Sequence, residues 1–172
     1  GNDEVTLGGN AISSGISTIY GGDGETLTQN NGSSLKIDVQ DSAKIDVAGS
    51  GSGYRDTIST GDNASMIFEG NYSANNVSIV AGANATLNFA GTSSASYVGM
   101  FDTISVGDGA SLTFSDHLAG YADSITAGDN ATLTYSGYLA GNNSTISLEW
   151  NVPKDTVEGL KQRGHKVVVA QR

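Results

Sequence analysis

The sequence predicts an all-β fold, a parallel β-helix (β-solenoid) of about seven to eight coils with ~21 residues per coil, closed by a short C-terminal helix-plus-strand cap. Three observations lead to this fold class. The chain repeats itself at a nearly constant interval, apolar and polar residues alternate within each repeat, and glycine accounts for 24 of the 172 residues while charged residues make up only 15%. This composition suits short strands joined by tight turns rather than long helices.

An isoleucine, in most repeats between hydroxyl residues, marks each unit. The marker occurs at Ile19, Ile37, Ile58, Ile79, Ile104, Ile125 and Ile146, so the intervals are 18, 21, 21, 25, 21 and 21 residues. A glycine and a turn signature such as G-D-N follow, and a second strand with alternating apolar residues comes next, as in 64–68. The longest unit carries its four extra residues in 92–101, outside both predicted strands.

Residues 1–148 form the predicted solenoid, and 1–16 are interpreted as a degenerate coil. Residues 149–172 form the predicted cap, with a helix at about 153–163 that Pro153 opens and a strand at about 165–171. A cap is expected because unpaired strand edges recruit other chains.

Charge and composition exclude several classes of partner. The net charge is −10, and residues 1–153 hold three basic against sixteen acidic side chains, so the body repels nucleic acid and anionic membranes. No apolar run reaches the ~18 residues of a membrane span. The chain has no cysteine, which rules out disulfides and thiolate metal sites. We therefore predict no nucleic-acid partner, no membrane insertion and no cofactor.

Two sets of aspartates recur at fixed repeat positions: Asp62, Asp108 and Asp129 in one, and Asp56, Asp102 and Asp123 in the other. Carboxylates one strand spacing apart in exposed turns repel each other by only ~1 kcal/mol, so turn chemistry alone explains them. A catalytic pair is expected to break the repeat, and the sequence therefore predicts no enzyme.

Metal sites are not expected. The segment 21–29, GGDGETLTQ, resembles a single calcium-binding nonapeptide, which leaves only weak Ca²⁺ binding at Asp-containing turns as a hypothesis. His117 and His165 lack metal-ligand spacing, and both are expected at the surface.

Two surfaces are candidates for interaction. Hydroxyl side chains are expected to form two outward ranks on one flat face, represented by Thr57, Ser59, Thr103, Ser105, Ser124, Thr126, Thr145 and Ser147. A candidate assembly segment comprises Lys166, Val167, Val168, Val169 and Ala170. Pairing of this segment with the N-terminal edge of another copy would give end-to-end filaments.

The units GDNATLTYSG and GDGASLTFSD, with AGANATLNFAG before them, resemble repeats in the passenger regions of bacterial autotransporter adhesins, the AIDA-like type included. The resemblance covers roughly residues 17–148. It implies a right-handed parallel β-helix that is secreted or surface-exposed and that works in adhesion or self-association.

The leading functional hypothesis is a non-enzymatic, extracellular or cell-surface structural and adhesive module of bacterial or phage origin. Its expected partners are further copies of itself or a cell-surface or glycan partner. Two alternatives stay open at this point: a carbohydrate-binding or carbohydrate-cleaving β-helix of the phage fibre or depolymerase type, and an ice-binding solenoid that uses the hydroxyl ranks.

Overall fold

The computed structural model describes residues 4–7, 18–30, 33–49, 52–70, 73–90, 97–115, 119–136, 140–141, 143–148, 154–162 and 165–169. Over these residues the chain forms fifteen strands and one helix. Their bounds are β1 (Glu4–Leu7), β2 (Thr18–Tyr20), β3 (Thr26–Gln29), β4 (Lys36–Asp38), β5 (Lys44–Val47), β6 (Thr57–Thr60), β7 (Ser65–Phe68), β8 (Ser78–Ala81), β9 (Thr86–Phe89), β10 (Thr103–Val106), β11 (Ser111–Phe114), β12 (Ser124–Ala127), β13 (Thr132–Tyr135), β14 (Thr145–Leu148), α1 (Lys154–Gln162) and β15 (Lys166–Val169).

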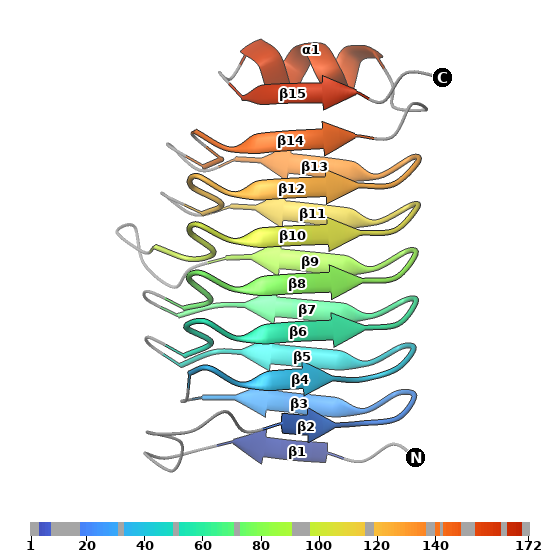
Figure 1. The fold of residues 1–172 in the computed structure, drawn as a ribbon, viewed down its shortest axis with the longest axis vertical. Helices are drawn as coiled ribbons and strands as arrows, with labels where there is room; N and C mark the ends of the chain where they lie inside the picture. Colours follow the sequence, from blue (N-terminus) through green and yellow to red (C-terminus); the bar gives the residue numbers. More distant parts are fainter. Residues whose placement is uncertain are drawn as a thin grey trace.

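The strands build two parallel sheets that stack along one axis (Figure 1). Sheet A has the order β1-β3-β5-β7-β9-β11-β13, and sheet B has the order β15-β14-β12-β10-β8-β6-β4-β2. Within the described residues, six consecutive strand pairs, from β2 and β3 to β12 and β13, make coils with one strand in each sheet. The predicted β-solenoid is therefore confirmed.

The pairing register carries each repeat position onto the same position of the next coil. Ile104 pairs with Ile79 on one side and with Ile125 on the other, and Leu112 pairs with Leu87 and Leu133 in the same way. Because side chains alternate between the two faces of a strand, one residue type stays inside through the whole stack. The core consequently consists of columns in which similar residues of successive coils pack on one another.

An aromatic column runs through the core beside sheet A. Phe89 stacks on Phe68 with ring centroids 4.6 Å apart, and Phe114 stacks on Phe89 at 4.8 Å and on Tyr135 at 4.8 Å. The three ring pairs are within 11° of parallel. These distances match the spacing of adjacent strands, about 4.8 Å, so the register itself sets the ring stacking.

The G-D-N corner depends on a left-handed asparagine and on an aspartate that bonds to a neighbouring coil. Asn63, Asn84 and Asn130 have φ angles of 58°, 55° and 58°. Asparagine tolerates this conformation better than most residues because its short polar side chain bonds locally. Asp62 Oδ1 accepts a hydrogen bond of 2.8 Å from the backbone N–H of Ala83, one coil further on. The turn therefore also links the coils.

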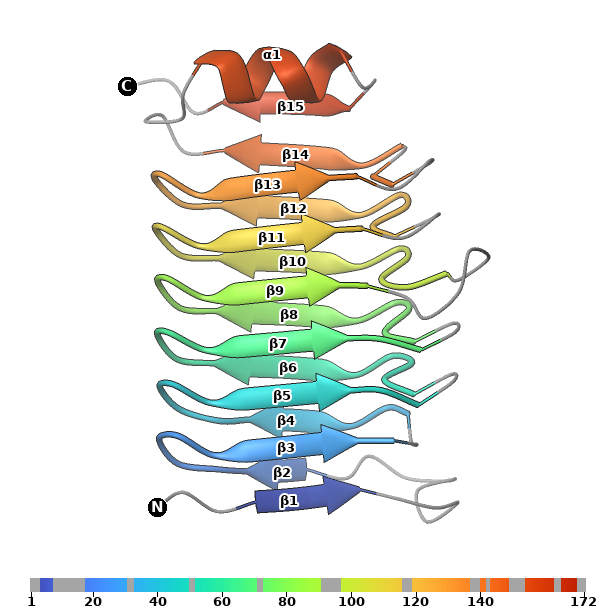
Figure 2. The same ribbon diagram turned by 180° about the vertical axis from the view of Figure 1, so that it is seen from behind.

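Helix α1 closes the C-terminal end of the stack. Its Val157 and Leu160 are buried, and the helix packs against β15. Figures 1 and 2 show α1 on the sheet A side, beyond β13, where a further strand of that sheet would lie. Pro153, predicted to open this helix, and Ala170 lie outside the described residues. In the described part of the chain, no helix has the length and apolarity needed to cross a lipid bilayer.

Candidate functional site

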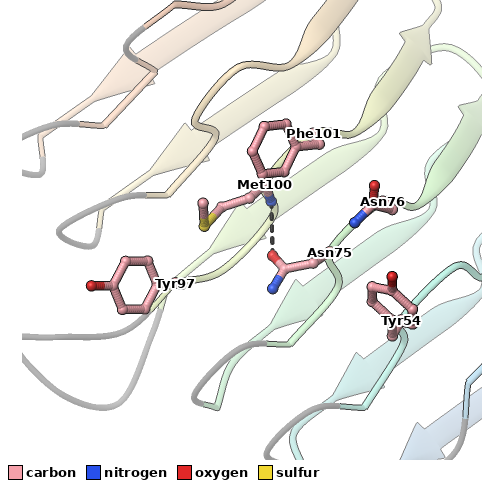
Figure 3. Close-up of a pocket in the computed structure, with 6 residues that line it drawn as sticks. All are labelled: Tyr54, Asn75, Asn76, Tyr97, Met100 and Phe101. Carbon is pink, nitrogen blue, oxygen red and sulfur yellow. Dashed lines mark hydrogen bonds between the residues drawn. The ribbon is translucent and has the colours of Figure 1, made fainter.

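A hollow of about 310 Å³ opens at the corner where the chain enters sheet B (Figure 3). We call it the corner groove, and it is lined by Tyr54, Asn75, Asn76, Tyr97, Met100 and Phe101. These residues come from the segments that precede β6, β8 and β10. The long unit that breaks the repeat at 92–101 supplies three of the six, so the groove lies where the solenoid departs from its own pattern.

Backbone hydrogen bonds between coils hold the lining residues in register. The N–H of Arg55 donates to the carbonyl of Asn75 at 3.1 Å, and the N–H of Asn76 donates to the carbonyl of Met100 at 2.8 Å. Tyr54, Asn75 and Met100 therefore occupy one repeat position in three successive coils. The next position holds Arg55, Asn76 and Phe101, and of these Asn76 and Phe101 line the groove together with the first column.

The groove exposes unusually large apolar side chains for a corner made otherwise of small and polar residues. Tyr54 is 39% exposed and Phe101 is 53% exposed. The Phe101 ring meets Tyr121 of the next coil edge-on, with centroids 5.9 Å apart at 83°. The Arg55 guanidinium lies 5.2 Å from the centroid of the Tyr54 ring. Exposed aromatic surface that is held in place in this way is typical of a binding surface.

The backbone at Phe101 is strained. Its φ angle is 61°, a left-handed conformation that bulky residues seldom adopt. Two other coils place Asn76 and Asn143 at the same position, with φ angles of 59° and 61°. Asn75 Oδ1 supports the neighbouring residue, because it accepts the backbone N–H of Met100 at 2.9 Å (Figure 3). Ser34, Arg55 and Ala122 adopt the same left-handed conformation at this position in other coils, so the corner imposes it on every residue type. The Phe101 ring is exposed there rather than packed in the core.

Beneath the groove lies a column of buried carboxyl groups, which corrects the expectation that these aspartates are exposed turn residues. Asp56 and Asp102 are 1% exposed, and Asp123 is 2% exposed. Asp56 Oδ1 accepts the N–H of Leu35 at 2.8 Å, and Asp102 Oδ1 accepts the N–H of Val77 at 2.8 Å. Each of these carboxyl groups ties its coil to the preceding one from inside, whereas Val77 takes the equivalent position in the coil between Asp56 and Asp102.

Burial changes the titration of this column. It raises the pKa of Asp56 from 3.8 to about 6, against the opposing effect of its hydrogen bonds. Burial, and in second place the charge of Asp123, raise the pKa of Asp102 well above its usual range. Burial also raises the pKa of Asp123. Since these carboxyl groups lie inside the coil, they present no acid or base to the groove.

The other aspartate set occupies the turns, as predicted. Asp62 and Asp108 are exposed, and Asp129 is half-buried. Asp108 Oδ1 accepts the N–H of Asp129 at 2.8 Å, so these side chains serve the turn backbone. Across the described ranges, no group of three or more histidine, cysteine, aspartate or glutamate side chains is placed to hold a metal ion.

The predicted hydroxyl ranks lie on the outer face of sheet B. Pairing aligns one rank of Thr57, Thr103, Ser124 and Thr145 and a second of Ser59, Ser105, Thr126 and Ser147. All eight side chains are exposed or half-buried. Val80, which is 53% exposed, interrupts the second rank. Sheet A carries a comparable outer rank of Ser65, Thr86, Ser111 and Thr132, which sequence reasoning missed.

The predicted assembly segment forms β15, in which Lys166, Val167, Val168 and Val169 pair in parallel with β14. Val168 is 49% exposed on the outer face, and the assembly hypothesis stays a prediction. The expectation of a surface His165 is wrong. This residue is only 5% exposed, and its ring packs against Tyr135 at a tilt of 32°, with centroids 4.6 Å apart, at the end of the aromatic column. His117 lies outside the described residues.

Sequence reasoning singled out 92–101 as a break in the repeat but missed the groove. The sequence feature that could have revealed the groove is the pair of residues directly before Asp56, Val77, Asp102 and Asp123. In one-letter code this pair is YR at 54–55, NN at 75–76, MF at 100–101 and YA at 121–122. Three of these four pairs contain an aromatic residue, Tyr54, Phe101 or Tyr121, and these residues mark the surface. Comparison with protein-family models, with curated proteins and with solved structures finds no significant match to this chain.

Proposed function

We propose that this chain is a non-enzymatic adhesive solenoid that binds carbohydrate through the corner groove. The observation that carries the proposal is the pairing of exposed aromatic rings with asparagine amides in one hollow. The face of an aromatic ring is electron-rich and attracts the polarised C–H bonds on the face of a sugar ring. An amide offers both donors and acceptors to sugar hydroxyls.

The lining also favours binding over cleavage. Among the six lining residues there is no carboxyl group, and glycoside hydrolysis commonly requires two that flank the scissile bond. Asp102 follows Phe101 directly in the chain, but it is 1% exposed and bonds to Val77 inside the coil. A groove of this kind holds a glycan without attacking it.

A rigid scaffold supports the same proposal. Each coil is joined to its neighbours by parallel ladders in both sheets and by further bonds at the corners, such as that between Asn76 and Met100. The groove is therefore largely formed before any ligand arrives, and little ordering is required on binding. Attachment to a glycan-coated surface agrees with the adhesive role that the resemblance to autotransporter passengers implies.

The test is a panel of soluble oligosaccharides, with binding measured by isothermal titration calorimetry on the wild type and on Phe101→Asn. Asparagine already occupies this position at Asn76 and Asn143, so the variant keeps the backbone conformation while removing the ring. We expect about three- to tenfold weaker binding, the contribution of one aromatic contact.

The matched control is Tyr20→Ser, which removes an aromatic ring that is 74% exposed on β2, far from the groove. Serine occupies the same repeat position at Ser59. If Phe101→Asn and Tyr20→Ser lost the same affinity, the saccharide would bind at a site other than the corner groove. If the wild type bound no saccharide, the proposal would be refuted.

A further inference from the structure

The geometry points to a specific class of ligand: a neutral, linear polysaccharide of 1,4-linked sugar rings that lies along the solenoid axis with one ring per coil. This inference rests on the proposed function and names the substrate class of the same groove. It follows from the spacing, the order and the charge of the side chains along the corner.

The spacing is that of the coils. One column holds, in successive coils, Tyr54, Asn75, Met100 and Tyr121. Backbone hydrogen bonds set this order: the N–H of Arg55 donates to the carbonyl of Asn75 at 3.1 Å, that of Asn76 to Met100 at 2.8 Å, and that of Phe101 to Tyr121 at 2.9 Å. One coil advances the axis by about 4.8 Å, which agrees with the 4.8 Å between the stacked rings of Phe89 and Phe114. In an extended β-1,4-linked chain of gluco- or manno-type rings, each ring advances the polymer by nearly the same distance, so ring and coil stay in step over the few coils of the groove.

The order of side chains offers aromatic rings at three of the four steps and a pair of amides at the other. Tyr54 presents an aromatic ring, the next coil presents the amides of Asn75 and Asn76, the third presents Phe101, and the fourth presents Tyr121. Consecutive sugars would therefore meet a ring, a pair of amides, and two further rings. Tyr121 is held by the hydrogen bond that Asn143 Nδ2 donates to its hydroxyl at 2.8 Å. The binding surface thus continues beyond the hollow itself.

The charge selects against anionic polymers. None of the six residues that line the groove is charged at neutral pH, and the carboxyl groups beneath it are buried. The Arg55 guanidinium lies against the Tyr54 ring, but it is one cation within a body of large negative net charge. The surrounding body is strongly acidic, with three basic against sixteen acidic side chains in residues 1–153. Uronic-acid or sulfated chains are repelled by this field, whereas a neutral chain is not.

Calorimetry with neutral β-1,4-linked oligosaccharides tests the inference, using gluco-, manno- and N-acetylglucosamine series from the monosaccharide to the hexasaccharide. For at least one series we expect affinity to rise about three- to tenfold with each ring that reaches another aromatic side chain. The gain levels off once the coils from Tyr54 to Tyr121 are occupied. A 1,6-linked glucose series and a galacturonate series serve as the flexible and anionic comparators.

Tyr121→Asn is the decisive variant, because Asn75 occupies the same column and the substitution therefore fits the fold. It removes the last aromatic contact of the series, so we expect the rise in affinity with oligosaccharide length to end one ring earlier, with a smaller total gain from the disaccharide to the hexasaccharide than in the wild type. Unchanged circular dichroism and thermal unfolding establish that the variant is folded, and Tyr20→Ser is again the control.

The outcomes separate the two proposals. A monosaccharide that binds as tightly as the hexasaccharide overturns the axial inference and leaves carbohydrate binding intact. Tighter binding of the galacturonate series overturns the neutral class, and an equal length dependence in the 1,6-linked series overturns the linkage. Binding of no saccharide at all refutes the proposed function, and the inference with it.

Discussion

Asp123 Oδ1 accepts a hydrogen bond of 2.9 Å from the backbone N–H of Asp102, so one buried carboxyl group supports the backbone of another in the adjacent coil. The series continues in both directions. Asp102 accepts the N–H of Val77, and the hydroxyl of Ser144 accepts the N–H of Asp123 at 3.0 Å. These bonds satisfy backbone groups at a corner where the sheet ladders are interrupted, and they place carboxyl groups where water is scarce.

The first prediction is that the protein is more stable in mild acid than at neutral pH. Asp56 has a folded-state pKa of about 6 against 3.8 in the unfolded chain, so between these values the folded protein binds more protons. The free energy of unfolding therefore falls as pH rises through this window, by about 3 kcal/mol for Asp56 alone. The raised pKa values of Asp102 and Asp123 extend the fall to higher pH.

Urea titrations followed by circular dichroism at pH 4.5 and pH 8 measure this difference. The double variant Asp56→Asn and Asp102→Asn is the control, and its stability should depend less steeply on pH. A free energy of unfolding that increases from pH 4.5 to pH 8 in the wild type would show that these carboxyl groups are not held in a costly charged state.

The second prediction separates the hydrogen bond of Asp102 from its charge. In Asp102→Asn the amide oxygen still accepts the Val77 N–H, while the buried charge is gone, so we expect greater stability than the wild type at pH 8. In Asp102→Ala the Val77 N–H loses its acceptor, so the alanine variant should be less stable than the asparagine variant by about 1–3 kcal/mol. Urea unfolding at pH 8 measures all three proteins, and equal losses in both variants would mean that the charge itself stabilises the corner.

The third prediction concerns two glycines with opposite requirements. A Cβ at Gly120 would lie 2.5 Å from the Phe114 ring, and the residue has a φ angle of 69°, so Gly120→Ala should lower the free energy of unfolding by about 2 kcal/mol or more. A Cβ at Gly159 in α1 would meet nothing within 4 Å, so Gly159→Ala should raise the free energy of unfolding by about 0.5–1 kcal/mol. Thermal unfolding of both variants checks the pair, and a neutral Gly120→Ala would show that the aromatic column can shift.

The fourth prediction tests the aromatic column. Phe114 is fully buried between Phe89 and Tyr135, so Phe114→Ala should lower the free energy of unfolding by about 3–5 kcal/mol. Phe114→Leu should lose less, because part of the volume is kept. Tyr20→Ala, which removes an exposed ring, should stay within about 0.5 kcal/mol of the wild type. Chemical denaturation measures the free energy of unfolding of all three variants. If Phe114→Ala lost less stability than Tyr20→Ala, the aromatic column would contribute nothing to the stability of the fold.

The repeat by itself determined the architecture. An interval near 21 residues and a two-residue alternation require the same side to be buried in every coil, so Ile104, Leu112 and Phe114 could be placed inside from the sequence. The G-D-N signature likewise predicted a turn, and Asn63 and Asn130 have the left-handed conformation that such a turn uses.

Only the tertiary structure decided which side chains at the second corner lie inside. A sequence repeat shows that Asp102 and Asp123 are equivalent, but a polar residue beside a turn has no periodic signal that separates a buried position from an exposed one. Their burial depends on the backbone N–H groups of the preceding coil, which need an acceptor there. The same limit hid the corner groove. Tyr54, Asn75 and Phe101 are separated by more than twenty residues at each step, and only the stacking of coils brings them to one surface.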